Sequence, residues 1–299
     1  MMSEFYDGSV RVRAPATCAN LGPGFDSFGL AVGCLDAVEV ELTSNGVHVE
    51  VAGEGADSVP TDESHLVVRA IRATFDLLGV GQPGIRLSCT NRIPQSRGLG
   101  SSAAAIVSGI QSAQALVPGA VLGSDQALTL AAALDGHPDN VAACLLGRFT
   151  VAWADGAVTR AVRLDVHRDV SPVLFVPPTL ASTRVARELL PQQVPHVDAR
   201  VNAGRAGLFV AAVTRYPHEL LAATEDRLHQ SFRRSMMPAS LNLVDRLREA
   251  GVAAVISGAG PTVLALTTPA TPVHPVEWTP VDWAWLRLPV ADAAGAVRT

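Results

Sequence analysis

Short stretches in which apolar and polar residues alternate open the chain. Val10 and Val12 alternate with arginines, and the runs 38–42 and 47–51 place an apolar residue at every second position. This period of two predicts β-strands. Asn45-Gly46 lies between the two runs, so we expect them to pair as a hairpin. Further strands are expected at 85–89, 149–153, 173–176, 253–256, 263–266 and 283–288.

Longer stretches carry apolar residues at helical spacing. The stretch 65–78 follows polar capping residues and closes at Gly79, and the stretch 106–116 ends just before Pro118. Both ends are typical of helix boundaries. Further helices are expected at 124–135, 183–190, 201–214, 219–233 and 239–250. Because strands and helices do not alternate strictly, the pattern predicts an α+β protein, with a boundary region around 155–178.

Composition narrows the classes of protein that remain. With 299 residues, 48% of them hydrophobic and 17% charged, the chain is long and apolar enough for two globular domains. A net charge of −5 without a basic run argues against nucleic acid or an anionic membrane as partner. We see no signal peptide and no apolar stretch near the ~18 residues of a membrane span. Four scattered cysteines without a CxxC motif favour a cytoplasmic protein with reduced thiols.

The chain contains no lysine, since all 23 basic residues are arginine. This excludes a Schiff-base lysine, a pyridoxal anchor and the Walker A loop. Any phosphate chemistry must therefore use backbone amides, arginine and a metal ion.

Small residues gather at the start of one predicted helix, where residues 97–105 read RGLGSSAAA. Gly98 and Gly100 allow positive φ and a close approach of the backbone to a ligand. A helix N-terminus offers unpaired amides and the positive end of the helix dipole, which suit a phosphate group. Close packing of the alanines, with the serines as caps, is the alternative.

Two other glycine-containing stretches suggest ligand contacts. Residues 14–26 read APATCANLGPGFD, and Asn20 and Asp26 flank its tight turn, where they could bind a small polar ligand. Residues 257–262 read SGAGPT and follow an apolar strand. Standing alone, either stretch could instead be a structural turn.

The segment 94–104, PQSRGLGSSAA, resembles the second signature of the GHMP kinases, whose loop holds ATP phosphates. The stretches 14–26 and 257–262 resemble the first and third motifs of that family, in the same order. Within the superfamily, the form of the first motif and GHPDNVA at 136–142 are most similar to the homoserine kinases. HLVVRA, NAGRA and EDRLHQ, at 65–70, 202–206 and 225–230, add to this resemblance, which extends from about Val10 to Leu266.

The resemblance implies a two-domain fold. The N-terminal, ATP-binding domain, like domain 2 of ribosomal protein S5, is expected at residues 1–160, and a ferredoxin-like C-terminal domain at 161–299. ATP and L-homoserine would bind between them, and ATP would phosphorylate the homoserine hydroxyl on the way to threonine. The oligomeric state is not evident from the residues, and a homodimer is possible because family members often dimerise.

The resemblance also implies roles for individual residues. ATP would be held by Pro94, Arg97, Gly98, Leu99, Gly100, Ser101, Ser102, Ala103 and Ala104. Mg²⁺ would be held by Ser102 and Asp135, where the family more often has glutamate. Homoserine would be bound by Asn20, Asp26, His137, Asn140, Thr183, Arg187, Arg233 and Gly260. Asn140 and Arg187 are the expected catalytic residues, with the arginines on the carboxylate and Asp26 on the ammonium group.

Asparagine cannot accept a proton as a general base, so Asn140 predicts catalysis without a strong protein base. Two alternatives remain open at this point. One is another small-molecule kinase on the same fold, such as a mevalonate or shikimate kinase. The other is a metabolite-sensing protein that has lost catalysis, which only the aspartate at position 135 favours.

Overall fold

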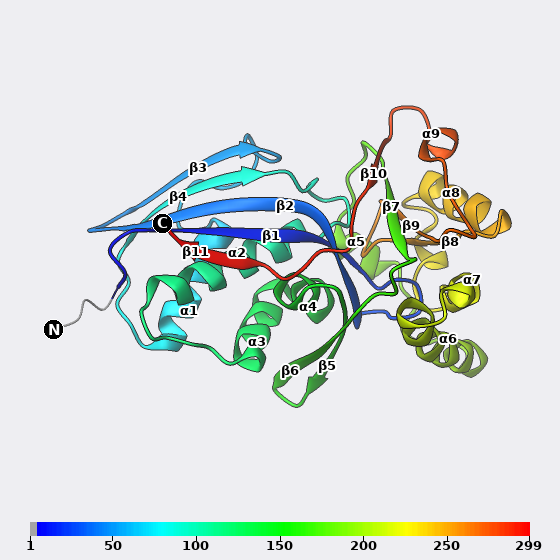
Figure 1. Cartoon of the computed structure of the whole chain (residues 1–299), viewed down its shortest axis with the longest axis horizontal. Coiled ribbons are helices and arrows are strands. Elements are labelled where there is room, and N and C mark those ends of the chain that lie inside the picture. Colours follow the sequence, from blue (N-terminus) through cyan, green and yellow to red (C-terminus); the bar gives the residue numbers. More distant parts are fainter. Residues whose placement is uncertain (1–4) are drawn as a thin grey trace.

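Two β-sheets organise the computed structural model, which describes residues 5–299 (Figure 1). The first sheet has seven strands, with the order β11-β1-β2-β4-β3, and β5 pairs with β2 while β6 pairs with β5. Its strands are β1 (Ser9–Ala19), β2 (Phe28–Thr43), β3 (Val47–Gly53), β4 (Gly84–Asn91), β5 (Phe149–Asp155), β6 (Val158–Leu164) and β11 (Gly295–Arg298).

Four helices cover one face of this sheet (Figure 1). They are α1 (Leu66–Leu78), α2 (Ser101–Leu116), α3 (Ser124–Asp135) and α4 (Pro138–Leu146). Alternate strand residues such as Val10, Val40 and Leu87 are buried against Ile71 and Phe75 of α1. The opposite face carries exposed cross-strand ion pairs between arginines and glutamates. The alternation in the sequence thus separates an apolar face from a solvated one.

The predicted hairpin between β2 and β3 is wrong. β4 lies between these two strands, pairing antiparallel with β2 and parallel with β3. Asn45-Gly46 does form a turn, with Gly46 at a φ of 74°. The chain then crosses over through α1 before it returns as β4, so the choice of strand neighbour depends on packing far from the turn.

The second sheet has the order β10-β7-β9-β8, and all its neighbours are antiparallel. These strands are β7 (Ser171–Val176), β8 (Ala253–Ile256), β9 (Val263–Thr267) and β10 (Ala284–Arg287). Numbered within this half, the order is fourth, first, third, second, which is the ferredoxin-like arrangement expected for the C-terminal domain. Its helices are α5 (Thr183–Glu188), α6 (His196–Thr214), α7 (Leu220–Ala223), α8 (Pro238–Glu249) and α9 (Pro275–Trp278).

The expected domain boundary at residue 160 differs from the structure in two places. β6 continues to Leu164 and pairs along its length with β5 of the first sheet. The C-terminal strand β11 returns to the first sheet and pairs with β1, so the last residues do not belong to the second domain (Figure 1). A short edge strand and a returning tail leave little pattern in the sequence.

The predicted helix 219–233 is also wrong. Only α7 and two short 3₁₀ turns, Pro217–Glu219 and Ser231–Arg233, are helical there, and residues 224–230 form an irregular loop. The reason is local competition for amides, because the Asp226 carboxylate accepts hydrogen bonds from backbone N–H groups that a helix would use. The other expected strands and helices are present, while β6, β11, α4 and α9 were not predicted.

Candidate active site

A cavity of about 1200 Å³ lies between the two halves of the chain. The loop of the first motif lines it with Phe25 and Asp26, and residues 98–102 line it beside the start of α2. From the second domain come Arg187 of α5, Arg233, and the glycine loop that follows β8. The three motifs that are far apart in the sequence therefore meet around one space.

The start of α2 is open toward this cavity. Gly98 and Gly100 have φ angles of 74° and 68°, and no side chain caps the helix. A Cβ on Gly98 would collide with the carbonyl oxygen of Ser257, and a Cβ on Gly100 would collide with the Thr17 hydroxyl. Among residues 5–299, no group accepts a hydrogen bond from the backbone N–H groups of residues 98–103. These amides are therefore free donors at a helix N-terminus, an arrangement that suits an anion.

Hydrogen bonds from the other two motifs fix the shape of this loop. The backbone N–H of Thr17 donates to Leu99 O at 3.0 Å, and the Ser257 hydroxyl donates to Gly98 O at 2.6 Å. The Arg97 guanidinium donates to the carbonyl oxygens of Pro177 and Pro178 at 3.1 and 3.2 Å. The Arg97 side chain thus ties the loop to the second domain.

Asp135 lies at the end of α3 and lines the cavity with Ser102. Burial raises the pKa of Asp135, and a hydrogen bond from the Ser102 hydroxyl opposes this rise. Within the described part of the chain, no cluster of three or more His, Cys, Asp or Glu residues could hold a metal by itself. A half-buried carboxylate beside a hydroxyl nevertheless supplies the oxygen donors that Mg²⁺ prefers, with the remaining positions left to ligand and water.

Two arginines of the cavity wall lie close to the Phe25 ring. The guanidinium carbons of Arg187 and Arg233 lie 5.5 and 5.7 Å from the centre of the Phe25 ring. Arg233 is 2% exposed, and its pKa is lowered by burial and by the nearby charge of Arg187. The Nε of Arg187 is buried and has no hydrogen-bond partner among the described residues. Two neighbouring cations and a free donor favour a bound carboxylate.

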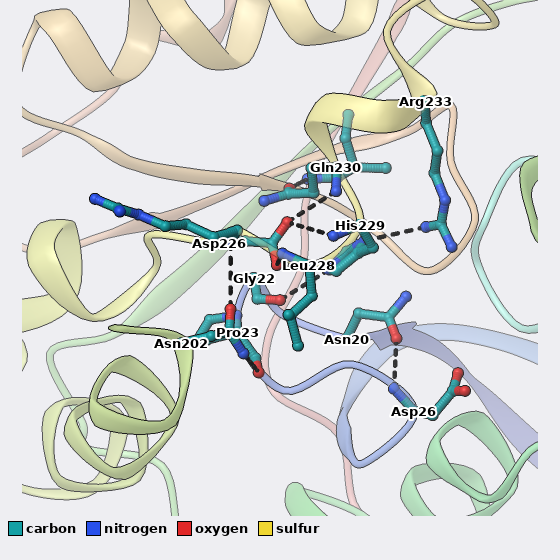
Figure 2. A network of polar contacts seen from close by, with 12 residues as sticks. Asn20, Gly22, Pro23, Asp26, Asn202, Asp226, Leu228, His229, Gln230 and Arg233 are labelled. Carbon is teal, nitrogen blue, oxygen red and sulfur yellow. Dashed lines mark hydrogen bonds and ion pairs between the residues drawn. The ribbon is translucent and has the colours of Figure 1, made fainter. Parts of the chain in front are cut away.

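Asp26 pairs with Arg187, with Oδ1 2.6 Å from Nη2. Asn20 holds Asp26 in place by accepting from its backbone N–H at 2.9 Å (Figure 2). The Asn20 amide also donates to Gly258 O at 2.9 Å. Asn20, Leu21 and Asp26 all have positive φ angles, which non-glycine residues adopt at a cost of about 1–3 kcal/mol each. Such concentrated strain is typical of functional loops.

His137 and Asn140 begin α4 and line the same cavity. Burial and the charge of Arg187 lower the pKa of His137, although Asp26 and Asp135 oppose them. The Asn140 Oδ1 accepts from the Thr17 hydroxyl at 2.8 Å, and its amide nitrogen lies 3.3 Å from Asp139 Oδ1. Asn140 is therefore held between the first motif and Asp139.

Sequence reasoning missed Asp139 as a site residue. It is 3% exposed and lines the cavity, and burial raises its pKa to about 7. Phe25 was missed as well, and so were Thr17 and His229. Asp139 and Phe25 lie inside motifs that were quoted, but only the fold shows which members of a motif turn toward the cavity.

Not every predicted site residue reaches the cavity wall. Thr183 does, whereas Gly260 lies behind it, and a Cβ there would meet the Met237 side chain. Among the expected ATP ligands, the wall contains Gly98, Leu99, Gly100, Ser101 and Ser102. Pro94, Arg97, Ala103 and Ala104 do not line it, and both alanines are buried.

Comparison with known proteins identifies the family. The model of the GHMP kinases N terminal domain matches residues 65–148, and that of the GHMP kinases C terminal matches residues 210–274. A homoserine kinase of Streptomyces avermitilis is 53% identical over 295 residues, covering 98% of this chain and 96% of the relative. The chain belongs to the homoserine kinase family of GHMP kinases.

Solved structures agree with this assignment. The homoserine kinase of Cytophaga hutchinsonii has a TM-score of 0.84 at 26% identity, covering 99% of this chain and 98% of that one. A mevalonate kinase of Methanococcus jannaschii, at 12% identity and a TM-score of 0.68, shares the fold. The expected two-domain GHMP kinase fold is thereby confirmed. In the described residues, no helix has both the length and the apolar character needed to cross a bilayer.

Proposed function

We propose that this homoserine kinase binds ATP and L-homoserine together in the cavity between its domains. It transfers the γ-phosphoryl group of ATP to the side-chain hydroxyl of homoserine and forms O-phospho-L-homoserine. The observation that carries the proposal is that unpartnered amides at the start of α2 and a pair of arginines line one cavity. One end suits a polyphosphate and the other suits an amino-acid carboxylate.

The backbone amides of residues 98–103 hold the β- and γ-phosphates of ATP. This role is supported by the fixed position of the amides, because Thr17 and Ser257 hold the loop through hydrogen bonds to its carbonyl oxygens. Donors that need no rearrangement stabilise developing charge more effectively than mobile ones. Phosphoryl transfer depends chiefly on such positioning and charge neutralisation.

Asp135 and Ser102 are the residues that would hold Mg²⁺ against the phosphates. A bound Mg²⁺ ion would supply positive charge that neutralises the phosphate groups of ATP. Asp135 is one methylene shorter than the glutamate that is commoner in the family. Ser102 and Asp135 line the same cavity, and Ser102 acts on the pKa of Asp135, so the two side chains are neighbours there.

The homoserine carboxylate binds between Arg187 and Arg233. It satisfies the buried Nε of Arg187 and separates two cations that otherwise repel each other. Asp26 takes the ammonium group, and Asn20 orients Asp26 through its backbone. Thr183 and His137 line the remaining wall. Gly260 does not line the cavity and packs against the Met237 side chain.

The reacting hydroxyl lies near Asn140, which Thr17 and Asp139 hold in one orientation. Asn140 contributes a hydrogen bond, and the hydroxyl proton passes to phosphate or water. With a pKa raised to about 7, Asp139 keeps its proton for part of the time near neutral pH. We propose that its main effect is on the position of Asn140.

An ADP-release assay with a panel of alcohols tests the proposal. L-Homoserine should release ADP in the presence of Mg²⁺ and ATP, whereas mevalonate and shikimate should not. ADP release that needs no homoserine, or a preference for another alcohol, would refute it. Nucleotide binding without any turnover would instead favour the sensor. We also propose that the reaction takes place in the cytoplasm, and a homodimer stays a prediction.

A further inference from the structure

The loop 224–230, which contains the EDRLHQ segment, holds a buried polar network that reaches Arg233 (Figure 2). Asp226 organises the loop by accepting from the backbone N–H groups of Leu228, His229 and Gln230 at 2.9, 3.2 and 2.8 Å. Gln230 Oε1 accepts from Ile256 N at 2.6 Å, just before the third motif. The loop is therefore fixed to the second sheet.

The same loop is joined to the first motif from the opposite side. Asn202 of α6 donates to Pro23 O at 2.8 Å and accepts from Arg227 N at 3.3 Å. His229 reaches Gly22 O with its Nε2 at 2.8 Å (Figure 2). The loop 224–230 thus connects the first-motif turn with the strand that leads into the third motif.

The two neighbours of His229 determine its protonation state. Gly22 O only accepts, so Nε2 must carry a proton, and a guanidinium only donates, so Nδ1 must accept from Arg233 Nη1 at 3.1 Å. The ring is 0% exposed, and burial lowers its pKa, while Asp226 opposes this shift and Arg233 adds to it. Geometry and burial both require the neutral Nε2–H tautomer.

The contacts of Arg233 show what this tautomer achieves. Nε donates to Ala186 O at 3.2 Å, and Nη1 donates to His229 and to Gly258 O, each at 3.1 Å. In the described structure, the Nη2 group has no protein partner. The His229 ring also stacks on Phe25, with centroids 5.1 Å apart, and Phe25 in turn packs against both arginines.

We propose that His229 is a positioning residue for homoserine binding, which acts as an obligate neutral acceptor and aims the free edge of the Arg233 guanidinium at the substrate carboxylate. This inference rests on the proposed function of the same cavity. His229 does not touch the substrate, because its buried ring is enclosed by Gly22, Phe25, Asp226 and Arg233 and does not line the cavity. Its effect should fall on homoserine and not on ATP, because His229 bonds the Arg233 guanidinium and makes no hydrogen bond to residues 98–103.

Two amide variants separate the two nitrogens of the ring. In His229→Asn the short amide places an acceptor near the position of Nδ1, whereas in His229→Gln the longer amide places a donor near Nε2. His229→Gln should raise the KM for homoserine about tenfold, the loss expected when one charge-assisted hydrogen bond disappears. His229→Asn should stay within about threefold, and the KM for ATP should change less than twofold in both variants.

The inference would be overturned if both variants changed the KM for homoserine equally or if the KM for ATP rose by the same factor. It would also be overturned if neither KM changed. Because a variant of a buried histidine could fold poorly, imidazole ¹⁵N chemical shifts of the unaltered chain give an independent measurement. They should report one protonated nitrogen, Nε2, and a protonated Nδ1 would overturn the inference. If the unaltered chain does not phosphorylate homoserine, the proposed function itself fails. That result differs from a failure of the His229 inference, in which the unaltered chain is active but the variants do not behave as expected.

Discussion

Replacing Arg187 by alanine should weaken the binding of homoserine while leaving that of ATP unchanged. The substitution removes a buried Nε that has no partner among the described residues, together with the charge above the Phe25 ring. It also removes the partner of Asp26, at 2.6 Å. The expected change therefore depends on which of these losses is larger.

The magnitudes favour the loss of the ligand contact. A hydrogen bond between charged groups contributes about 1.5–3 kcal/mol, which corresponds to roughly a ten- to hundredfold change in affinity. The pair between Arg187 and Asp26 has both side chains 35% exposed, so solvent screening limits it to about 1 kcal/mol or less. We therefore expect a ten- to hundredfold higher KM for homoserine and only a small change in stability.

Steady-state kinetics with each substrate varied in turn provide the assay. Arg187→Lys keeps the charge but loses the planar fork, so it should recover only part of the affinity. Arg168→Ala is the matched control, because the Arg168 side chain is 92% exposed and does not line the cavity. An unchanged KM for homoserine in Arg187→Ala, or an equal rise in the KM for ATP, would refute the reasoning.

Four further changes test other parts of the site. Gly100→Ala should reduce kcat/KM for ATP by at least about tenfold, because its Cβ would collide with Thr17 at a φ of 68°; normal ATP kinetics would exclude a fixed loop. Asn140→Ala should lower kcat by about tenfold with little change in either KM, whereas a complete loss of turnover would indicate a larger role. Asp135→Ala should raise the Mg²⁺ concentration needed for half-maximal activity, and an unchanged requirement would remove Asp135 as a ligand. Burial raises the pKa of Asp139 to about 7 in the folded chain, whereas an unfolded aspartate has a pKa of about 4. Between these pH values the folded chain binds a proton that the unfolded chain releases. The stability of the wild-type protein therefore falls as pH rises from about 4 to about 7. Asp139→Asn should remove up to roughly 4 kcal/mol of this pH-dependent loss, and parallel curves of unfolding temperature against pH for the two proteins would contradict the assignment.

Local signals in the sequence predicted most elements of the fold. The apolar stripe of α1 and the left-handed Gly79 that ends it both follow from neighbouring residues. The glycine loop before α2 was also evident, because only small residues allow its backbone path. Strand neighbours were not evident, since the insertion of β4 between β2 and β3 depends on the crossover through α1.

The parts of the site that were missed depend on contacts between distant segments. His229 is 207 residues from Gly22, with which it shares a hydrogen bond, and nothing near His229 in the sequence announces that contact. Asp139 stands beside the quoted Asn140, but its raised pKa results from burial that only the fold produces. The segment 224–230 has helical spacing, yet Asp226 takes the amides that a helix needs.

Amide NMR of the chain, titrated with a non-hydrolysable ATP analogue and Mg²⁺, tests the central claim most directly. The claim is that the free backbone N–H groups before and at the start of α2 hold the phosphates beside an amino-acid pocket. We predict that the amide signals of residues 98–103 shift most on adding the nucleotide, and that Nε of Arg187 shifts only when L-homoserine follows. Nucleotide binding that leaves the signals of residues 98–103 unchanged would contradict the account.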